Sequence, residues 1–168
     1  MPQRLAALGG ILLLAGCSDA AAPGPGSFHA RLSGVRMTTL SGESGASPFF
    51  GVEYPDARFA IRMFDQGGGE VRALVLHCPG ETPPPAGAYA VSTAVADCAG
   101  SYSRVRTTVE GEISVLETTQ ASSGQLTVNA VDGGEVTGSF NFQGTLVVGS
   151  DSGGRLLATG AFSSTTFP

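Results

Sequence analysis

The chain has 168 residues, and its nine basic and fourteen acidic residues give it a formal charge of −5. A chain of about this length forms one domain around one core, so we expect no second domain. The negative charge and the lack of a basic stripe disfavour nucleic acid as a partner.

The first predicted element is a signal peptide over residues 1–16. Arg4 supplies a positive charge ahead of an apolar run from Leu5 to Ala15. This run is too short for a membrane-spanning helix, which needs about 20 apolar residues. The four residues LAGC that end at Cys17 resemble the bacterial lipobox at every position. The resemblance implies that Cys17 is acylated on its sulfur and becomes the first residue after cleavage. An ordinary secretory signal peptide and a buried N-terminal helix are the alternatives.

Residues 17–27 form the second predicted element, a lipidated cysteine followed by a flexible tether. The sequence SDAAAPGPGS is small and rich in Pro and Gly, so it cannot bury one face against a core. By resemblance to the sorting rule of enterobacteria, Ser18 directs the anchored chain to the outer membrane. We therefore predict a membrane-anchored lipoprotein of the bacterial cell envelope, on the outer membrane and facing the periplasm or the exterior. Its lipid anchor makes the membrane its first predicted partner.

Cys78 and Cys98 remain as a pair once Cys17 is assigned to the lipid. A chain exported to an oxidising compartment keeps such a pair as a disulfide, which we predict here. It would close a loop of about 20 residues and stabilise the fold by about 3 kcal/mol in the chain-entropy model. Two free thiols and a metal-binding pair are the alternatives.

A single all-β domain is predicted over residues 28–168, with one strand at its very start. Apolar and polar residues alternate along most of it, which is typical of strands with one buried face. The predicted strands cover residues 27–39, 49–54, 58–64, 71–78, 87–93, 101–109, 112–119, 124–131, 135–148 and 156–167. Turn signals between them favour an antiparallel sandwich or barrel of about nine or ten strands.

The last three predicted strands form a C-terminal meander. In EVTGSFNFQGTLVV (135–148) the even positions are mostly apolar and the odd positions between them are polar. Gly138 and Gly144 lie on the apolar face, where a glycine in a strand marks a bulge or bend. The sequence DGGE before this strand is a hairpin signal, and GSDSGGR after it turns the chain into the final strand.

No motif in the chain predicts a catalytic site. The sequence GESGA (42–46) misses the G-x-S-x-G nucleophile elbow and is predicted to be a loop. His29 and His77 lie on different predicted strands, and each is expected to be a half-exposed or core imidazole. We predict no catalytic residue, metal site or cofactor. A small envelope hydrolase that uses one of the two histidines is the alternative.

Arginines alternate along several predicted strands. They could line a cationic patch for an anionic glycan or lipid, but cross-strand pairs with carboxylates explain them without a ligand. The arginines are Arg58, Arg62, Arg72, Arg104 and Arg106, and the candidate carboxylates are Glu53, Glu70, Glu110 and Glu112.

The whole pattern resembles a family of small bacterial envelope lipoproteins of uncharacterised function. The resemblance rests on the lipobox, on FHARLSG (28–34), on PAGAY (85–89) and on the segment from Gly124 to Phe142. It implies an all-β domain behind a lipid anchor, and it brings no activity, cofactor or catalytic residue.

The sequence therefore predicts a lipid-anchored binding or structural module of the cell envelope. The alternative is an assembly or accessory factor that binds another envelope protein, which would present an exposed apolar patch or a sheet edge. A protein or a glycan of the envelope is the possible partner, and the sequence does not identify it.

Overall fold

The computed structural model describes residues 22–49, 56–108 and 110–166. The predicted signal peptide and Cys17 lie outside these residues, and so does the first part of the tether. Nine strands make up the described fold. They are β1 (Ser27–Gly34), β2 (Thr38–Phe49), β3 (Arg58–Gly67), β4 (Glu70–Pro79), β5 (Gly87–Ser92), β6 (Ala99–Thr107), β7 (Ile113–Asp132), β8 (Glu135–Val148) and β9 (Arg155–Thr166).

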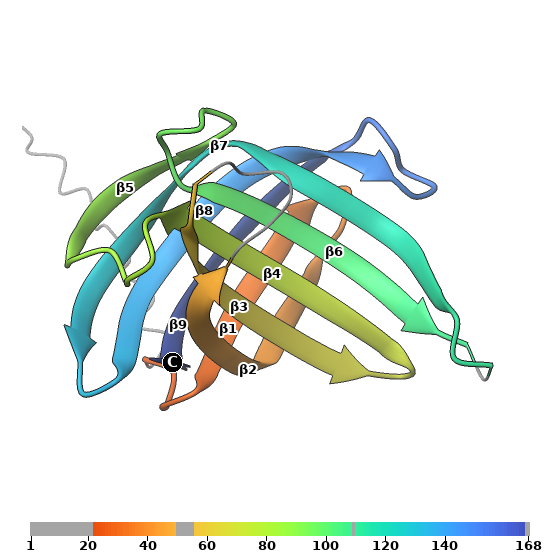
Figure 1. Cartoon of the computed structure of the whole chain (residues 1–168). Helices are drawn as coiled ribbons and strands as arrows, with labels where there is room; N and C mark the ends of the chain where they lie inside the picture. Colours follow the sequence, from red (N-terminus) through yellow and green to blue (C-terminus); the bar gives the residue numbers. More distant parts are fainter. Residues whose placement is uncertain (1–21, 50–55, 109, 167–168) are drawn as a thin grey trace, which may run out of the picture.

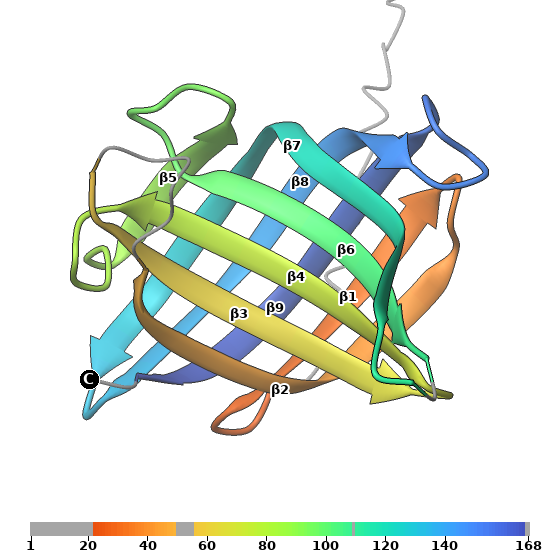
Figure 2. The same ribbon diagram turned by 45° about the vertical axis from the view of Figure 1, so that its right-hand side comes forward.

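The strands form a closed antiparallel barrel. Of the two predicted architectures, the barrel is therefore confirmed and the sandwich is not. The order around it is β7-β6-β4-β3-β2-β1-β9-β8, and pairing of β8 with β7 closes the ring of eight strands. The remaining strand, β5, pairs with the second half of β7 beyond the residues that pair with β6. Figures 1 and 2 show β5 splitting away from β6 at one side of the barrel.

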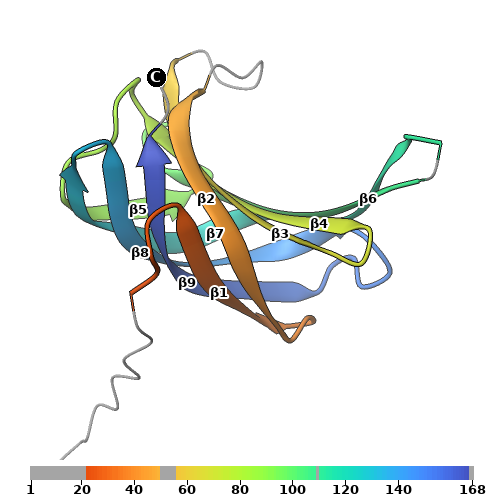
Figure 3. The ribbon, with the colours of Figure 1, turned by 90° about the horizontal axis from the view of Figure 1, so that it is seen from below.

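The barrel has two ends, which we name by their distance from the start of β1. The near end holds the start of β1, the turn between β7 and β8, and the end of β9. The far end holds the β1–β2, β3–β4, β6–β7 and β8–β9 connections. Figure 2 shows the end of β9 at the near end, across the barrel from the β8–β9 turn. Figure 3 shows the β6–β7 pair projecting beyond its neighbours at the far end.

Alternate side chains of each strand fill the barrel. On β8, for example, Phe140, Phe142 and Leu146 are buried while Ser139, Asn141 and Thr145 are exposed. The predicted alternation is thus confirmed, and so is the C-terminal meander of β7, β8 and β9. The largest buried apolar side chains are Tyr102, Phe142, Phe162, Leu32, Leu40, Ile61, Met63, Leu74, Leu76, Leu126 and Leu146.

The two glycines on the buried face of β8 mark the places where β7 bends. The pairing of β7 with β8 shifts register opposite Gly144 and again opposite Gly138. A Cβ at either position would overlap a backbone carbonyl of β7, that of Gln120 or Thr127. Only glycine allows the two backbones to approach this closely, so the expected bends are confirmed.

Two predicted boundaries are wrong. The strand predicted over 27–39 is split, because Gly34 has a φ of 99° and turns the chain before Thr38. The segments 112–119 and 124–131 belong to one strand, β7, because a bulge continues the pairing through Ser122.

The predicted loop 42–46 is also wrong, because it lies within β2. Ser44 faces the interior toward the near end of the barrel, where its hydroxyl forms a hydrogen bond with that of Ser164. Because this inward-facing position carries a serine, the segment lacks the alternation of apolar and polar residues that predicts a strand. The strand predicted over 49–54 falls on residues outside the described part, apart from Phe49 at the end of β2.

Candidate functional site

Charged side chains gather inside the far end of the barrel. Arg104 on β6 lies opposite Arg72 on β4 and opposite Glu117 on β7, so three adjacent strands present charges to the same side. Arg36 reaches Glu117 from the β1–β2 connection. These residues share a face with the apolar core, because Tyr102, two residues before Arg104, is a core residue.

Two glutamates hold the arginines of this group together. Glu117 Oε1 accepts hydrogen bonds from Arg36 Nε at 2.7 Å and from Arg104 Nη2 at 2.8 Å. Arg104 Nη1 also donates to Glu70 Oε2 at 3.0 Å, and Arg106 Nη2 donates to Glu70 Oε1 at 2.5 Å. We call these five residues the Glu117 cluster. Its members link β4, β6 and β7 to the β1–β2 connection.

The cluster stays ionised at neutral pH despite its burial. The side chain of Glu117 is 1% exposed. Burial alone would raise its pKa, but the hydrogen bonds from Arg104 and Arg36 outweigh burial and lower it. The hydrogen bonds from Arg106 and Arg104 likewise lower the pKa of Glu70. The carboxylates therefore carry their charges next to the guanidinium groups.

One buried atom of the cluster lacks a protein partner. Among the described residues, none forms a hydrogen bond with Glu117 Oε2. A buried polar atom without a partner costs free energy unless water or a ligand satisfies it. Glu117 lines a pocket of about 190 Å³ together with Arg36, Thr38, Glu70, Arg72, Tyr102 and Arg104. Burial, followed by the negative charge of Glu117, raises the pKa of Tyr102 to about 12, so its hydroxyl keeps its proton.

Exposed apolar side chains lie near several connections at the far end of the barrel. Met37 is 77% exposed and Ile113 is 72% exposed. Among the described residues, eight large apolar side chains are exposed, and six of them lie near the far-end connections. These six, which we call the apolar rim, are Met37, Ile113, Val115, Val147, Val148 and Leu157. Single exposed apolar residues are ordinary, but six of them at one end of the barrel make this end a candidate contact surface.

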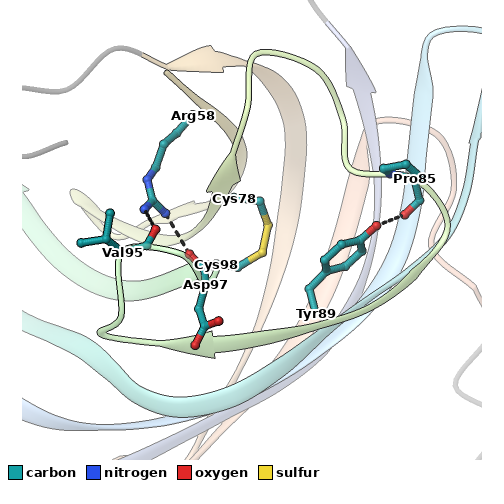
Figure 4. The surroundings of a disulfide bond; sticks show 7 residues. All are labelled: Arg58, Cys78, Pro85, Tyr89, Val95, Asp97 and Cys98. Carbon is teal, nitrogen blue, oxygen red and sulfur yellow. Dashed lines mark hydrogen bonds between the residues drawn. A yellow bond between two sulfur atoms is a disulfide. The ribbon is translucent and has the colours of Figure 1, made fainter. Parts of the chain in front are cut away.

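The near half of the barrel carries the predicted disulfide, which the structure confirms. Cys78 at the end of β4 is bonded to Cys98, just before β6, across a sequence separation of 20. Arg58 donates hydrogen bonds to the carbonyl oxygens of Val95 and Asp97 and so holds the β5–β6 loop in place (Figure 4). The disulfide and Arg58 thus fix the loop at the place where β5 leaves β6.

The two histidines do not share a site. His29 lies on β1, whereas His77 lies near the end of β4, paired with Ala60 and Ala99. His77 is buried and borders a pocket of about 180 Å³ with residues 92–94 of the β5–β6 loop. Burial, and then the positive charges of Arg58 and Arg62, lower the pKa of His77 to about 4.

We expect His77 to make the stability of the fold depend on pH. Its pKa is about 6.5 in an unfolded chain and about 4 in the folded one. Below pH 6.5, His77 of the unfolded chain therefore binds a proton that His77 of the folded chain does not bind. This binding favours the unfolded state, so the free energy of unfolding falls as the pH falls from 6.5 toward 4. Between pH 7 and pH 5 this loss should be about 2 kcal/mol.

The measurement compares the free energy of unfolding of the full chain with that of His77→Gln at both pH values. Both chains share the titration of the carboxylates, so the difference between them should change by about 2 kcal/mol. An equal pH dependence of the two chains would show that His77 does not titrate as described.

The predicted pairing of arginines with carboxylates is confirmed in part. Glu70 pairs with Arg104 and Arg106, as the sequence suggested. Glu53 lies outside the described residues. The sequence did not identify Arg36 and Glu117, which are central to the cluster. Glu117 follows Val115 and Ile113 at two-residue spacing, so a regular strand would place all three side chains on one face. Only the bulge near Leu116 turns Glu117 inward.

Comparisons with known proteins give no match for this chain. The chain matches no protein-family model, no curated protein and no solved structure. Within the described residues, no helix has the length and apolar character needed to cross a bilayer.

Proposed function

We propose that this protein is a lipid-anchored binding module of the bacterial cell envelope, similar to the small envelope lipoproteins that its sequence resembles. In this proposal acylated Cys17 holds the chain on the outer membrane, and the far end of the barrel docks onto another envelope protein. The observation that carries the proposal is the apolar rim.

The position of the anchor supports this orientation. Cys17 precedes the first residue of β1, Ser27, by ten positions, and β1 starts at the near end. Ten extended residues span at most about 35 Å. An anchor attached at the near end favours an orientation in which the far end faces away from the membrane, toward other components of the envelope.

The chemistry of the far end supports a protein as the partner. Its exposed apolar side chains would gain from burial against a second apolar surface. Four of its arginines, Arg36, Arg72, Arg104 and Arg106, are paired with carboxylates, as in the contacts of Arg36 with Glu117 and Asp151. A surface with both charges in balance has little attraction for an anionic lipid or polymer, whereas apolar cores with a polar rim are typical of protein interfaces.

Co-purification tests the proposal. The full chain with an affinity tag is isolated from envelopes in mild detergent, next to the double variant Met37→Ser and Ile113→Ser. Truncating apolar anchors of an interface costs about 1–2 kcal/mol each, so recovery of the partner should fall by at least about tenfold. Val131→Ser is the matched control and should keep full recovery, because Val131 is exposed and lies at the near end of the barrel, where β7 ends. Equal recovery with all three chains would contradict docking through the far end.

A further inference from the structure

We propose that the pocket beside Glu117 is a binding site for a neutral, hydroxyl-rich ligand of the size of one sugar ring. The residues that line the pocket include none of the apolar rim, so this inference is tested without a partner protein. It rests on the unsatisfied oxygen of Glu117, on the mixture of donors and acceptors around it, and on the size of the pocket.

The unsatisfied oxygen calls for a hydrogen-bond donor. Glu117 is almost fully buried, and its Oε2 has no partner among the described residues although its Oε1 has two. An ionised carboxylate oxygen in such surroundings is a strong acceptor. A ligand that donates an N–H or O–H group into the pocket would remove the cost of leaving it unpaired.

The neighbours of Glu117 argue against a simple cation as this donor. Guanidinium groups of Arg36 and Arg104 already contact the same carboxylate, and Arg72 lines the same pocket. A further positive charge placed beside three arginines would be repelled. A simple anion is disfavoured as well, because Glu117 and Glu70 both line the pocket and both stay ionised.

A hydroxyl group suits both kinds of neighbour at once. It donates one hydrogen bond, here to Glu117 Oε2, and it accepts others through its lone pairs. Arg72 has donors to offer, since its ion pair with Asp65 is long, at 3.8 Å, and leaves room for a second acceptor. The hydroxyls of Thr38 and Tyr102 can donate or accept on the other walls of the pocket.

The size and access of the pocket fit a single ring. Its volume of about 190 Å³ is many times the volume of about 10–15 Å³ that a single water requires, which leaves room for a small ring. The side chains of Arg36 and Arg72 are 35% and 29% exposed, so the pocket opens to solvent between them. A ring can therefore approach from the far end, and these partly exposed guanidinium side chains must move aside for it to reach the buried Oε2 of Glu117.

NMR of the 15N-labelled full chain tests the inference. The chain is kept in a zwitterionic detergent without sugar headgroups, and D-glucose, D-galactose and N-acetyl-D-glucosamine are titrated separately to millimolar concentrations. We expect at least one sugar to give saturable shifts of arginine Nε–Hε signals. Arg72→Gln and Tyr102→Phe each remove one hydrogen-bonding group and should raise the dissociation constant about threefold to tenfold.

Two controls make the result decisive. Arg31→Gln changes an exposed arginine on β1 outside the pocket and should leave the dissociation constant unchanged. Inorganic phosphate and ethylammonium chloride, added at the same ionic strength, should not give the saturable shifts. Saturation by phosphate or by ethylammonium in place of the sugars would overturn the ligand class. The absence of saturable shifts with all three sugars, or equal weakening by Arg31→Gln and Arg72→Gln, would overturn the site.

Discussion

A chain carrying Cys17→Ser should incorporate no fatty acid and should keep residues 1–16. In the lipobox interpretation Cys17 is the attachment point of the lipid, because its sulfur receives the acyl groups before the signal peptide is removed. A serine offers no thiol, so neither acylation nor cleavage by the lipoprotein peptidase should follow. Labelling of cells with a fatty-acid analogue measures the first effect, and the mass of the purified chain measures the second.

Attachment of the Cys17→Ser chain to the membrane should be lost completely, because the anchor depends on several acyl chains. Each methylene group of a buried acyl chain contributes about 0.8 kcal/mol, and a single myristoyl chain still holds only reversibly. Stable attachment thus needs the several chains that only an acylated cysteine supplies. Ser18→Ala keeps Cys17 and should be labelled like the natural chain. Continued labelling of Cys17→Ser would refute the lipobox assignment.

The double variant Cys78→Ala and Cys98→Ala should lose about 3 kcal/mol of stability. The disulfide closes a loop with a sequence separation of 20, and removing it frees the unfolded chain of this constraint. For a chain of this size, such a loss lowers the midpoint of thermal unfolding by about 6–12 °C. Circular dichroism of the full chain follows the transition.

Reduction of the natural chain provides the control for this variant. Chemical reduction removes the bond but keeps both sulfur atoms in the core, whereas the alanine variant also loses their packing. The reduced chain should therefore unfold well below the oxidised one, and the alanine variant no higher than the reduced chain. If reduction left the midpoint unchanged, the disulfide would not stabilise the fold.

The barrel itself was largely accessible from the sequence, because most of its interior is apolar. Along β8 the inward positions are Val, Phe, Leu and Gly, and the outward positions are mainly polar, so strand and buried face follow from the order of residues. Choosing a barrel over a sandwich required the pairing of β7 with β8, which joins the two ends of the strand order.

The Glu117 cluster could not be predicted from the sequence in the same way. Glu117 follows Ile113 and Val115 at even spacing, which places all three on one face of a regular strand. The bulge near Leu116 reverses the faces, so that the two apolar residues become exposed while Glu117 turns into the barrel. No local signal in the sequence marks this bulge. Arg36, the partner of Glu117, lies 81 residues away in the chain.

The polar interior of the near end escaped detection for a related reason. Ser44 on β2 and Ser164 on β9 satisfy each other inside the barrel, and their burial depends on closure of the sheet. A serine in an isolated segment indicates a turn or an exposed position. Only contacts between distant strands show that it is buried.

Site-specific photo-crosslinking in living cells tests most directly whether the far end is the docking surface. A photoreactive amino acid replaces Met37 at the far end in one strain and Val131 near the other end in a second strain. We expect illumination to join the chain to one defined envelope protein from position 37 and not from position 131. Crosslinks from position 131 alone, or the same products from both positions, would contradict the proposal that the far end binds the partner.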